Sequence, residues 1–189
     1  RAGIPQETQL KLFAYFQMHY PRSTSYDEGR IMSALSHPLR KELAIHRSQV
    51  ALQVVHRMGD PGLLRALSTV LEPALFVHED TIIWTGELAD GIYFIENGFA
   101  AVILQTVTRT DSTVQRSDLE PANVVRLLSE GAFFGEMSIL YDKRAAANVC
   151  AHGFCTSLLL SRDAYHEIVA SFPIFRDCME TVAHAREPE

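Results

Sequence analysis

The residues best suited to chemistry lie in one short stretch, Phe134-Gly135-Glu136-Met137-Ser138. Gly135 has no side chain, so the backbone there can approach a ligand closely. Glu136, Met137 and Ser138 are predicted to form the first turn of a short helix, whose N–H groups lack partners within the helix and suit an anion. The Glu136 carboxylate would repel a phosphate but would accept a hydrogen bond from a sugar hydroxyl. The stretch therefore predicts a ligand that carries both a phosphate and a sugar.

This stretch resembles the phosphate-binding cassette of the cyclic nucleotide-binding domain family. The family pattern F-G-E-(I/L)-(A/S)-L-(L/I) is matched by residues 134–140 without a gap. In the family a turn and a phosphate-clasping Arg follow; in ungapped alignment that Arg falls on Ala145, and the next Thr or Ala falls on Ala146. Arg144 lies one place early, and shifting the turn by one residue restores the order Arg-Ala-Ala. Arg144 is either the phosphate ligand or a solvated loop arginine, and losing such a charge-assisted contact costs about 1.5–3 kcal/mol.

The composition is that of a globular protein with an acidic second half. The 189 residues are 47% hydrophobic and 21% charged, which is enough for a full core. Residues 1–72 carry nine Lys/Arg and six Asp/Glu, a net charge of +3, whereas residues 73–189 carry eight and seventeen, a net charge of −9. The acidic half argues against nucleic-acid binding.

Other features predict an intracellular piece of a larger protein. No run approaches the ~20 apolar residues of a membrane span, so no membrane contact is expected within this fragment. The first residues lack Met and a leader pattern, which suggests an excised soluble portion. Cys150, Cys155 and Cys178 are expected to be reduced core thiols, and the histidines show no metal-ligand spacing with them.

Residues 1–72 are predicted to be helical. Residues 7–20 place apolar and aromatic side chains at helical spacing, and Ser25 with Glu28 forms a capping box. The aromatic face packs either on the second half of the chain or on a partner. The order of a helix ended by proline, a capped helix and a Pro-Leu-Arg-Lys-Glu-Leu helix resembles the C-linker of hyperpolarization-activated and cyclic-nucleotide-gated channels. That resemblance implies a coupling and tetramerisation segment over residues 1–72, which rests on neighbouring subunits of a homo-tetramer.

From residue 73 the hydrophobic pattern takes the period of strands. Short β-rich runs alternate with turns at 75–77, 81–84, 92–95 and 99–104, and residues 96–98 are a predicted hairpin turn. This spacing favours an antiparallel barrel or sandwich. The segment resembles the family's β-roll, a jelly-roll-like double-stranded β-helix, although Glu79 stands where the family commonly has Gly. The predicted fold is α+β, with a helical C-linker over residues 1–72 and a cyclic nucleotide-binding domain over residues 73–189.

The last part of the chain is predicted to close the roll and to form two helices. Residues 106–123 indicate a long polar loop, and residues 147–151 and 155–160 indicate the closing strands. Ser161 is predicted to cap a helix over residues 162–171, and a last helix begins at Ile174.

In the family the terminal helix closes over the nucleotide base like a lid. The resemblance implies that the base packs on Val102 and on the lid near Val182 and Arg186, where the channel version has an arginine that contacts the purine. Without the resemblance, Arg186 is a cation at a helix C-terminus, where it interacts with the helix dipole. Ala146 lacks a hydroxyl that could bond a guanine, which favours cAMP by analogy with the family.

The expected function is ligand sensing without catalysis. The sequence contains no readable nucleophile–base pair and no Gly-Lys-Ser/Thr phosphate loop. No cofactor is expected, and cAMP or cGMP is the expected ligand. The resemblance implies a place on the cytoplasmic side of a membrane, as part of an integral membrane cation channel whose lid movement is coupled through the C-linker to the pore.

Other functions remain compatible with a β-roll. A catabolite-activator-like transcription factor is disfavoured by the acidic second half. A kinase regulatory subunit or an exchanger is a non-channel cyclic-nucleotide effector with the same roll. A channel domain that has lost nucleotide binding would act as a fixed coupling module.

Overall fold

The computed structural model describes residues 60–104 and 124–184, together with Thr8, Leu10, Lys11, Ser36, Pro38 and Leu39. The chain forms two compact units, Arg1–Leu43 and Ala44–Glu189, and both described ranges belong to the second unit. Apart from these single residues, the predicted helices before residue 60 lie outside the described residues, as do the predicted loop over residues 106–123 and Arg186. The boundary between residues 72 and 73 stays a prediction.

The described ranges form an antiparallel roll with helices before, within and after it. Their elements are α5 (Pro61–Val70), β1 (Glu72–Phe76), β2 (Thr81–Ile83), β3 (Gly91–Asn97), β4 (Ala100–Ile103), β5 (Val124–Leu128), β6 (Phe133–Phe134), α6 (Glu136–Tyr141), β7 (Asn148–Ala151), β8 (Cys155–Ser161), α7 (Arg162–Ser171) and α8 (Pro173–His184). The strands form two sheets, with the orders β1-β8-β3-β6 and β2-β7-β4-β5. The pairing is nested: β4 pairs with β5, β3 with β6, β2 with β7 and β1 with β8. This arrangement confirms the predicted α+β class and the β-roll.

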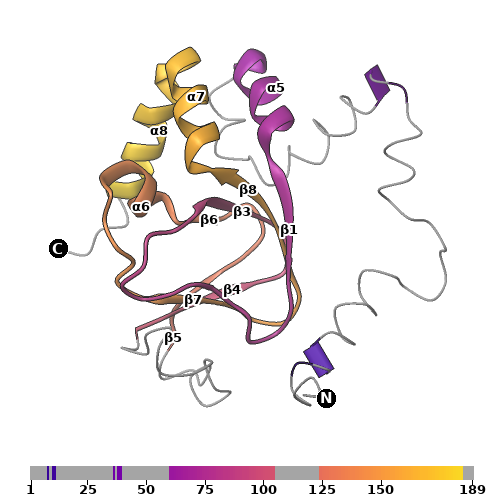
Figure 1. Ribbon diagram of the computed structural model, residues 1–189, viewed down its shortest axis with the longest axis vertical. Helices are drawn as coiled ribbons and strands as arrows, with labels where there is room; N and C mark the ends of the chain where they lie inside the picture. The colour runs from indigo at the N-terminus through magenta and orange to yellow at the C-terminus, as the bar shows by residue number, and fades with distance from the viewer. Residues whose placement is uncertain are drawn as a thin grey trace, which may run out of the picture. The chain divides into compact units, whose positions relative to one another are not determined.

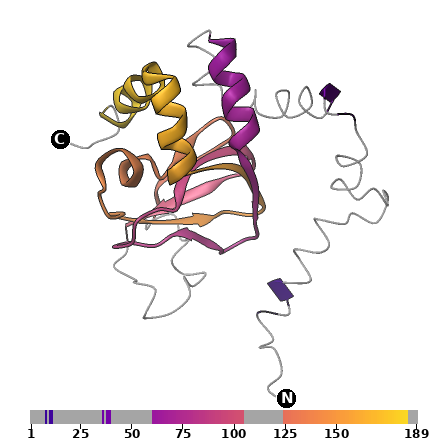
Figure 2. The same cartoon turned by 45° about the horizontal axis from the view of Figure 1, so that its top comes forward.

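Strand β3 separates two hydrophobic cores, because successive side chains of a strand point to opposite faces. Ile92 and Phe94 belong to the helix-side cluster, which also contains residues of α5, α7 and α8. Tyr93 and Ile95 belong to the interior cluster, which lies between the two sheets. The sheet β1-β8-β3-β6 is thus covered by helices on one face and by the second sheet on the other, and α5, α7 and α8 lie together on one side of the roll (Figures 1 and 2).

Helix α5 belongs to this roll core although it lies in the segment predicted as C-linker. The Asp60 side chain caps it by accepting the N–H groups of Gly62 at 2.8 Å and Leu63 at 3.1 Å. Leu63 and Leu67, one helical turn apart, are both 0% exposed in the helix-side cluster. Burying a leucine side chain contributes roughly 1.5–3 kcal/mol, so α5 adds substantially to the stability of the roll.

The two helices after the roll agree closely with the sequence. The helix predicted over residues 162–171 is confirmed as α7, and the Ser161 Oγ accepts the N–H of Ala164 at 3.3 Å. Helix α8 starts at Pro173, one place before the predicted Ile174, because proline suits the first turn of a helix. Both helices bury one face against the rest of the domain through Tyr165, Ile168, Phe175, Met179 and Ala183.

The first strand begins earlier than predicted. The sequence places it over residues 75–77, whereas β1 spans Glu72–Phe76 and includes Pro73. In sheet order β1 lies at an edge and pairs with β8, where Pro73 is opposite Leu158. Proline has no N–H to donate, but an edge strand has one side without a ladder, so the residue is tolerated there.

Candidate functional site

The candidate site is built around the junction between β6 and α6. Gly135 separates the two elements with a left-handed φ of 89°, and it is the N-cap residue of α6. A Cβ on Gly135 would lie 2.4 Å from the Gly91 carbonyl oxygen, so both conformation and space require glycine. The close approach that Gly135 permits is therefore to the chain itself. Because the cap has no side chain, no capping oxygen of its own covers the first amides of α6.

Glu136 is the first residue of α6 and is buried, with 6% of its surface exposed. An acidic side chain at this end of a helix is favoured by the helix dipole. Burial also holds the carboxylate in place, since a buried carboxylate must be matched by polar partners. Glu136 is thus a fixed acceptor, as the interpretation as a sugar-hydroxyl ligand requires.

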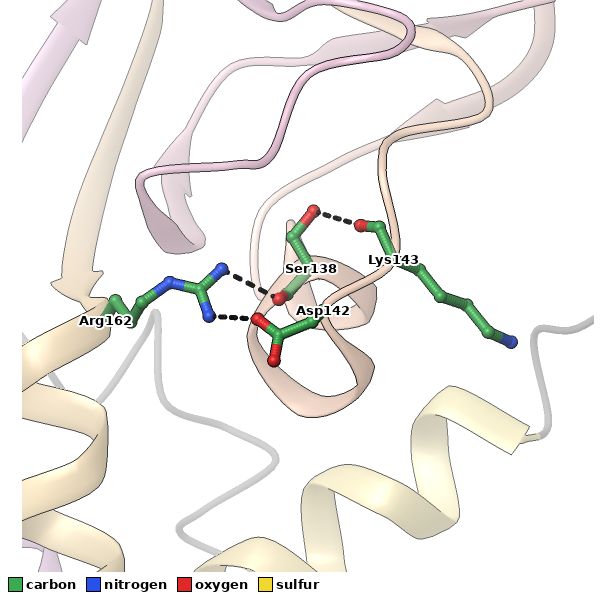
Figure 3. A network of polar contacts seen from close by, with 4 residues as sticks. All are labelled: Ser138, Asp142, Lys143 and Arg162. Carbon is green, nitrogen blue, oxygen red and sulfur yellow. Dashed lines mark hydrogen bonds and ion pairs between the residues drawn. The ribbon is translucent and has the colours of Figure 1, made fainter.

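The turn after α6 is held by hydrogen bonds from both sides. The Ser138 Oγ donates to the Lys143 carbonyl at 2.9 Å, across the turn. Arg162, the first residue of α7, donates to the Ser138 carbonyl at 2.9 Å and to the Asp142 Oδ1 at 2.6 Å. Figure 3 shows the guanidinium facing both acceptors from one side, with the Lys143 side chain running away from them.

Arg144 is exposed. Its guanidinium donates to the Gly86 carbonyl at 2.9 Å, in the loop after β2. Ala145 exchanges two backbone hydrogen bonds of 2.8 Å with this loop, one with Gly86 and one with Glu87. The Ala145 methyl packs against the interior cluster. The position aligned with the family's arginine thus faces the interior without a charge, while the neighbouring arginine is bonded at the surface.

The structure brings some of the predicted site residues together and separates others. Phe134 belongs to the interior cluster, and Val102 and Ala145 pack against it. Val182 is half-buried and packs against the helix-side cluster instead. Ala146 is exposed. The predicted base contacts, Val102 and Val182, therefore lie against different clusters.

Aromatic rings form the interior below the cassette. The Tyr93 ring stacks on the Phe134 ring, with centroids 5.2 Å apart and planes inclined by 12°. Burial raises the pKa of the Tyr93 hydroxyl, and the nearby Asp90 carboxylate raises it further. This hydroxyl therefore stays protonated at neutral pH and adds no charge to the interior.

Sequence reasoning did not identify four residues near the site. Arg126 of β5 lies directly opposite Val102 of β4, so both side chains start on the same face of that sheet. Arg162 contacts the end of α6, and the Tyr141 hydroxyl lies 3.4 Å from the His184 Nε2 at the end of α8. None of these contacts has a local sequence signal, because each joins residues far apart in the chain.

Comparison with known proteins assigns the family. The family model for the cyclic nucleotide-binding domain matches residues 75–172. The chain belongs to the cyclic nucleotide-binding domain family. The matched range contains the whole roll from Leu75, the cassette and α7.

Curated relatives of this cyclic nucleotide-binding domain include ion channels. The chain is 30% identical to potassium/sodium hyperpolarization-activated cyclic nucleotide-gated channel 1 of Rattus norvegicus, over 95% of this chain and 18% of the relative. It is 29% identical to channel 2 of Homo sapiens and to channel 4 of Oryctolagus cuniculus, over 95% of this chain and 19% and 14% of those relatives. The chain thus spans less than a fifth of the length of these channels.

A solved structure of another protein has the same fold as this cyclic nucleotide-binding domain. It is the co-crystal structure of the regulatory domain of Toxoplasma gondii PKA with cAMP, with a TM-score of 0.60 and 22% sequence identity. The match covers 78% of this chain and 51% of that one. Within the described residues of this chain, no helix is long and apolar enough to cross a membrane, and no group of three or more His, Cys, Asp or Glu could hold a metal ion.

Proposed function

We propose that the chain is the cytosolic ligand-sensing region of a cyclic-nucleotide-regulated cation channel. The observation that carries the proposal is the cassette of residues 134–140, folded as β6, a left-handed glycine and a short helix within a roll of the matching family. The similarity to hyperpolarization-activated channels extends over 95% of the chain and so reaches well beyond the roll. This extent supports the interpretation of residues 1–72 as a C-linker.

The cassette binds the cyclic phosphate and the ribose through different groups. The phosphate accepts hydrogen bonds from the amides of Glu136, Met137 and Ser138 and pairs with Arg144. The Glu136 carboxylate accepts a hydrogen bond from the ribose hydroxyl. The Arg144 bond to the Gly86 carbonyl is exposed, so exchanging that acceptor for a phosphate costs little.

Lid movement links the bound nucleotide to the rest of the channel. The base packs on Val102 and on the lid near Val182 and Arg186, and the lid-closed state gains population because it makes more contacts with the ligand. Val182 now packs on the helix-side cluster, so α8 has to change its position to bring this residue onto the base. Residues 1–72 carry the movement to a pore within a homo-tetramer. Ala146 has no hydroxyl for a guanine, which favours cAMP over cGMP.

Calorimetric titration of the 189-residue chain with cAMP and, separately, cGMP tests the binding step. Glu136→Ala and Arg144→Ala should each weaken binding by about 10- to 100-fold, through the loss of a charge-assisted hydrogen bond. The variant Arg126→Ala tests whether the arginine opposite Val102 also contributes to nucleotide affinity. The control is Arg65→Ala, an exposed arginine on α5, which should leave the affinity unchanged. An unchanged affinity in Arg144→Ala would remove Arg144 from the site.

A second candidate function is a channel domain that no longer binds nucleotide and acts as a fixed coupling module. The Ala145 methyl at the interior favours it, because the aligned position carries no charge for a phosphate. Absence of heat and of a thermal shift with both nucleotides at millimolar concentration would select this function. Sedimentation of the chain that does bind nucleotide tests the channel assignment separately: a tetramer promoted by nucleotide supports it, and a strict monomer favours a non-channel effector.

A further inference from the structure

Helix α6 is too short to satisfy its own backbone. It spans Glu136–Tyr141, and the last four carbonyls of any helix have no intrahelical donor. Short isolated helices are marginal in water, so α6 owes its geometry to contacts with other elements. The carbonyl of Ser138 is one of these four, and its donor comes from another helix, at the guanidinium of Arg162.

Arg162 is itself held firmly in place. It is the first residue of α7, directly after the last residue of β8. Its backbone N–H donates to the Asp90 carbonyl at 3.2 Å, and the preceding Ser161 pairs with Gly91 of β3. The side chain therefore reaches α6 from a backbone position fixed by the roll.

The starts of α6 and α7 meet at one residue of the roll. A Cβ on Gly91 would lie 2.2 Å from the Leu160 carbonyl oxygen, just before α7. A Cβ on Gly135, the cap of α6, would lie 2.4 Å from the Gly91 carbonyl oxygen. The backbone just before each helix thus packs closely on Gly91, and Arg162 adds a second connection toward the far end of α6.

The geometry points to Arg162 as a positioning residue that ties α6 to α7, so that a ligand at the first turn of α6 and the orientation of α7 are energetically coupled. The ligand half of this inference rests on the proposed function. The two acceptors lie on one residue inside α6 and one just after it, and the planar guanidinium fork fixes the direction to each. A shift of α6 would misalign both bonds together.

The alternative is an ordinary surface ion pair, and Asp142 distinguishes the two. Its side chain is 79% exposed, so the charge contact alone contributes little. Asp142 also ends α6 with a left-handed φ of 51°, a conformation that glycine adopts more easily. Asp142→Gly therefore improves the cap while it removes one acceptor of Arg162. If Asp142 is only a cap, the variant stabilises α6. If Asp142 is a partner of Arg162, the variant destabilises α6.

Amide hydrogen exchange of the 189-residue chain, followed by NMR without ligand, tests the connection. Arg162→Met should raise the exchange rates of the last α6 amides about ten-fold, and Asp142→Gly should also raise them. Arg162→Lys should recover only part of the protection, because a single ammonium cannot replace the two-pronged contact. The control is Arg176→Met, which breaks a comparable 2.7 Å ion pair with Glu180 within α8. It should leave α6 unchanged.

The same spectra with cAMP or cGMP at millimolar concentration test the coupling. In the unmodified chain, nucleotide should slow amide exchange in both α6 and α7. In Arg162→Met this slowing should be reduced in both helices, and the reduction should be several-fold larger in α7 than in α6. If α7 in Arg162→Met responds to nucleotide as strongly as α7 in the unmodified chain, the inference is wrong. It is also wrong if, without ligand, Arg162→Met leaves the exchange rates of α6 unchanged or Asp142→Gly lowers them. If neither nucleotide alters the unmodified chain, the proposed function fails, and the ligand-free exchange rates still decide whether Arg162 positions α6.

Discussion

At the scale of single residues, Glu79 has a strained backbone conformation, and the contacts of its side chain do not offset the energetic cost. It adopts a φ of 70° in the turn between β1 and β2, and its N–H donates to the Ala151 carbonyl at 3.0 Å. Its carboxylate lies 3.8 Å from the His78 Nε2 in a partly exposed pair, and so long a contact contributes little. The left-handed region costs a residue with a Cβ roughly 1–2 kcal/mol, whereas glycine enters it freely.

Glu79→Gly should therefore raise the free energy of unfolding by about 0.5–1 kcal/mol, measured by urea denaturation. Glu130 supplies the matched control, because it is an exposed turn residue outside the left-handed region. Glu130→Gly should lower stability by a similar amount, since it only adds freedom to the unfolded chain. A loss of stability in Glu79→Gly would mean that the His78 contact outweighs the strain.

Tyr165 makes stability depend on alkaline pH. Its hydroxyl is buried without a hydrogen-bond partner, and burial raises the pKa to about 12. Below pH 10 the Tyr165 hydroxyl is protonated in both the folded and unfolded states, so it causes no loss of stability in this range. Between pH 10 and 12 the unfolded chain releases the proton and the folded chain keeps it, so stability falls by up to about 3 kcal/mol.

Tyr165→Phe should remove this part of the alkaline decline and should be neutral or stabilising at pH 7, because it deletes an unpaired hydroxyl. Urea denaturation of both proteins from pH 7 to 12 measures the difference. A decline remains in the variant, since burial also raises the pKa of the Cys155 thiol to about 11. Parallel curves for the two proteins would contradict the assignment to Tyr165.

At the scale of elements, the loop after β2 is held beside the cassette by Asn148. This residue starts β7, is 1% exposed, and accepts the Thr85 N–H at 2.7 Å through its Oδ1. The neighbouring Gly86 pairs with Ala145 and accepts a hydrogen bond from Arg144. Asn148 thus fixes the backbone against which the predicted phosphate arginine lies.

Asn148→Ala should lower the free energy of unfolding by about 1–3 kcal/mol, because it leaves buried polar groups without their partner. It should also weaken any nucleotide binding that depends on Arg144. Asn97→Ala, at the exposed end of β3, should change stability by less than about 0.5 kcal/mol. Equal effects of the two variants in urea denaturation would show that the Thr85 contact does not order the loop.

What the sequence could predict at this scale was what local chemistry determines. Ser161 and the helix after it were predicted with the observed bounds, because a cap and a hydrophobic stripe act within a few residues. The first turn of α6 was predicted for the same reason. The contacts of Arg162 with Asp142 and of Arg144 with Gly86 left no trace in the sequence, since they depend on how separate elements pack. Periodicity also does not say which surface covers a helix, so it did not show that α5 shares the core of the roll.

At the scale of the whole molecule, α5 tests where the folded unit of the roll begins. Leu63→Ala should cost about 2–5 kcal/mol, as expected for a leucine in a packed core. Leu88→Ala, at a leucine that is 43% exposed, should cost less than about 1 kcal/mol. A fragment of residues 60–189 should keep the stability of the roll, whereas residues 73–189 should unfold at much lower urea. Similar unfolding of the two fragments would support the predicted boundary at residue 73.

The nested pairing of the strands also constrains how the chain reaches its native state. The innermost pair, β4 with β5, lies closest in sequence, and each outer pair joins segments further apart until β1 meets β8. A contact between distant segments costs loop-closure entropy before the contact itself stabilises the chain. Folding is therefore slower when a larger fraction of the native contacts joins distant segments. On the ribosome, β1 emerges long before β8, the strand with which it pairs. Sequence changes in β8 are therefore expected to act on the yield of folded protein as strongly as on its final stability.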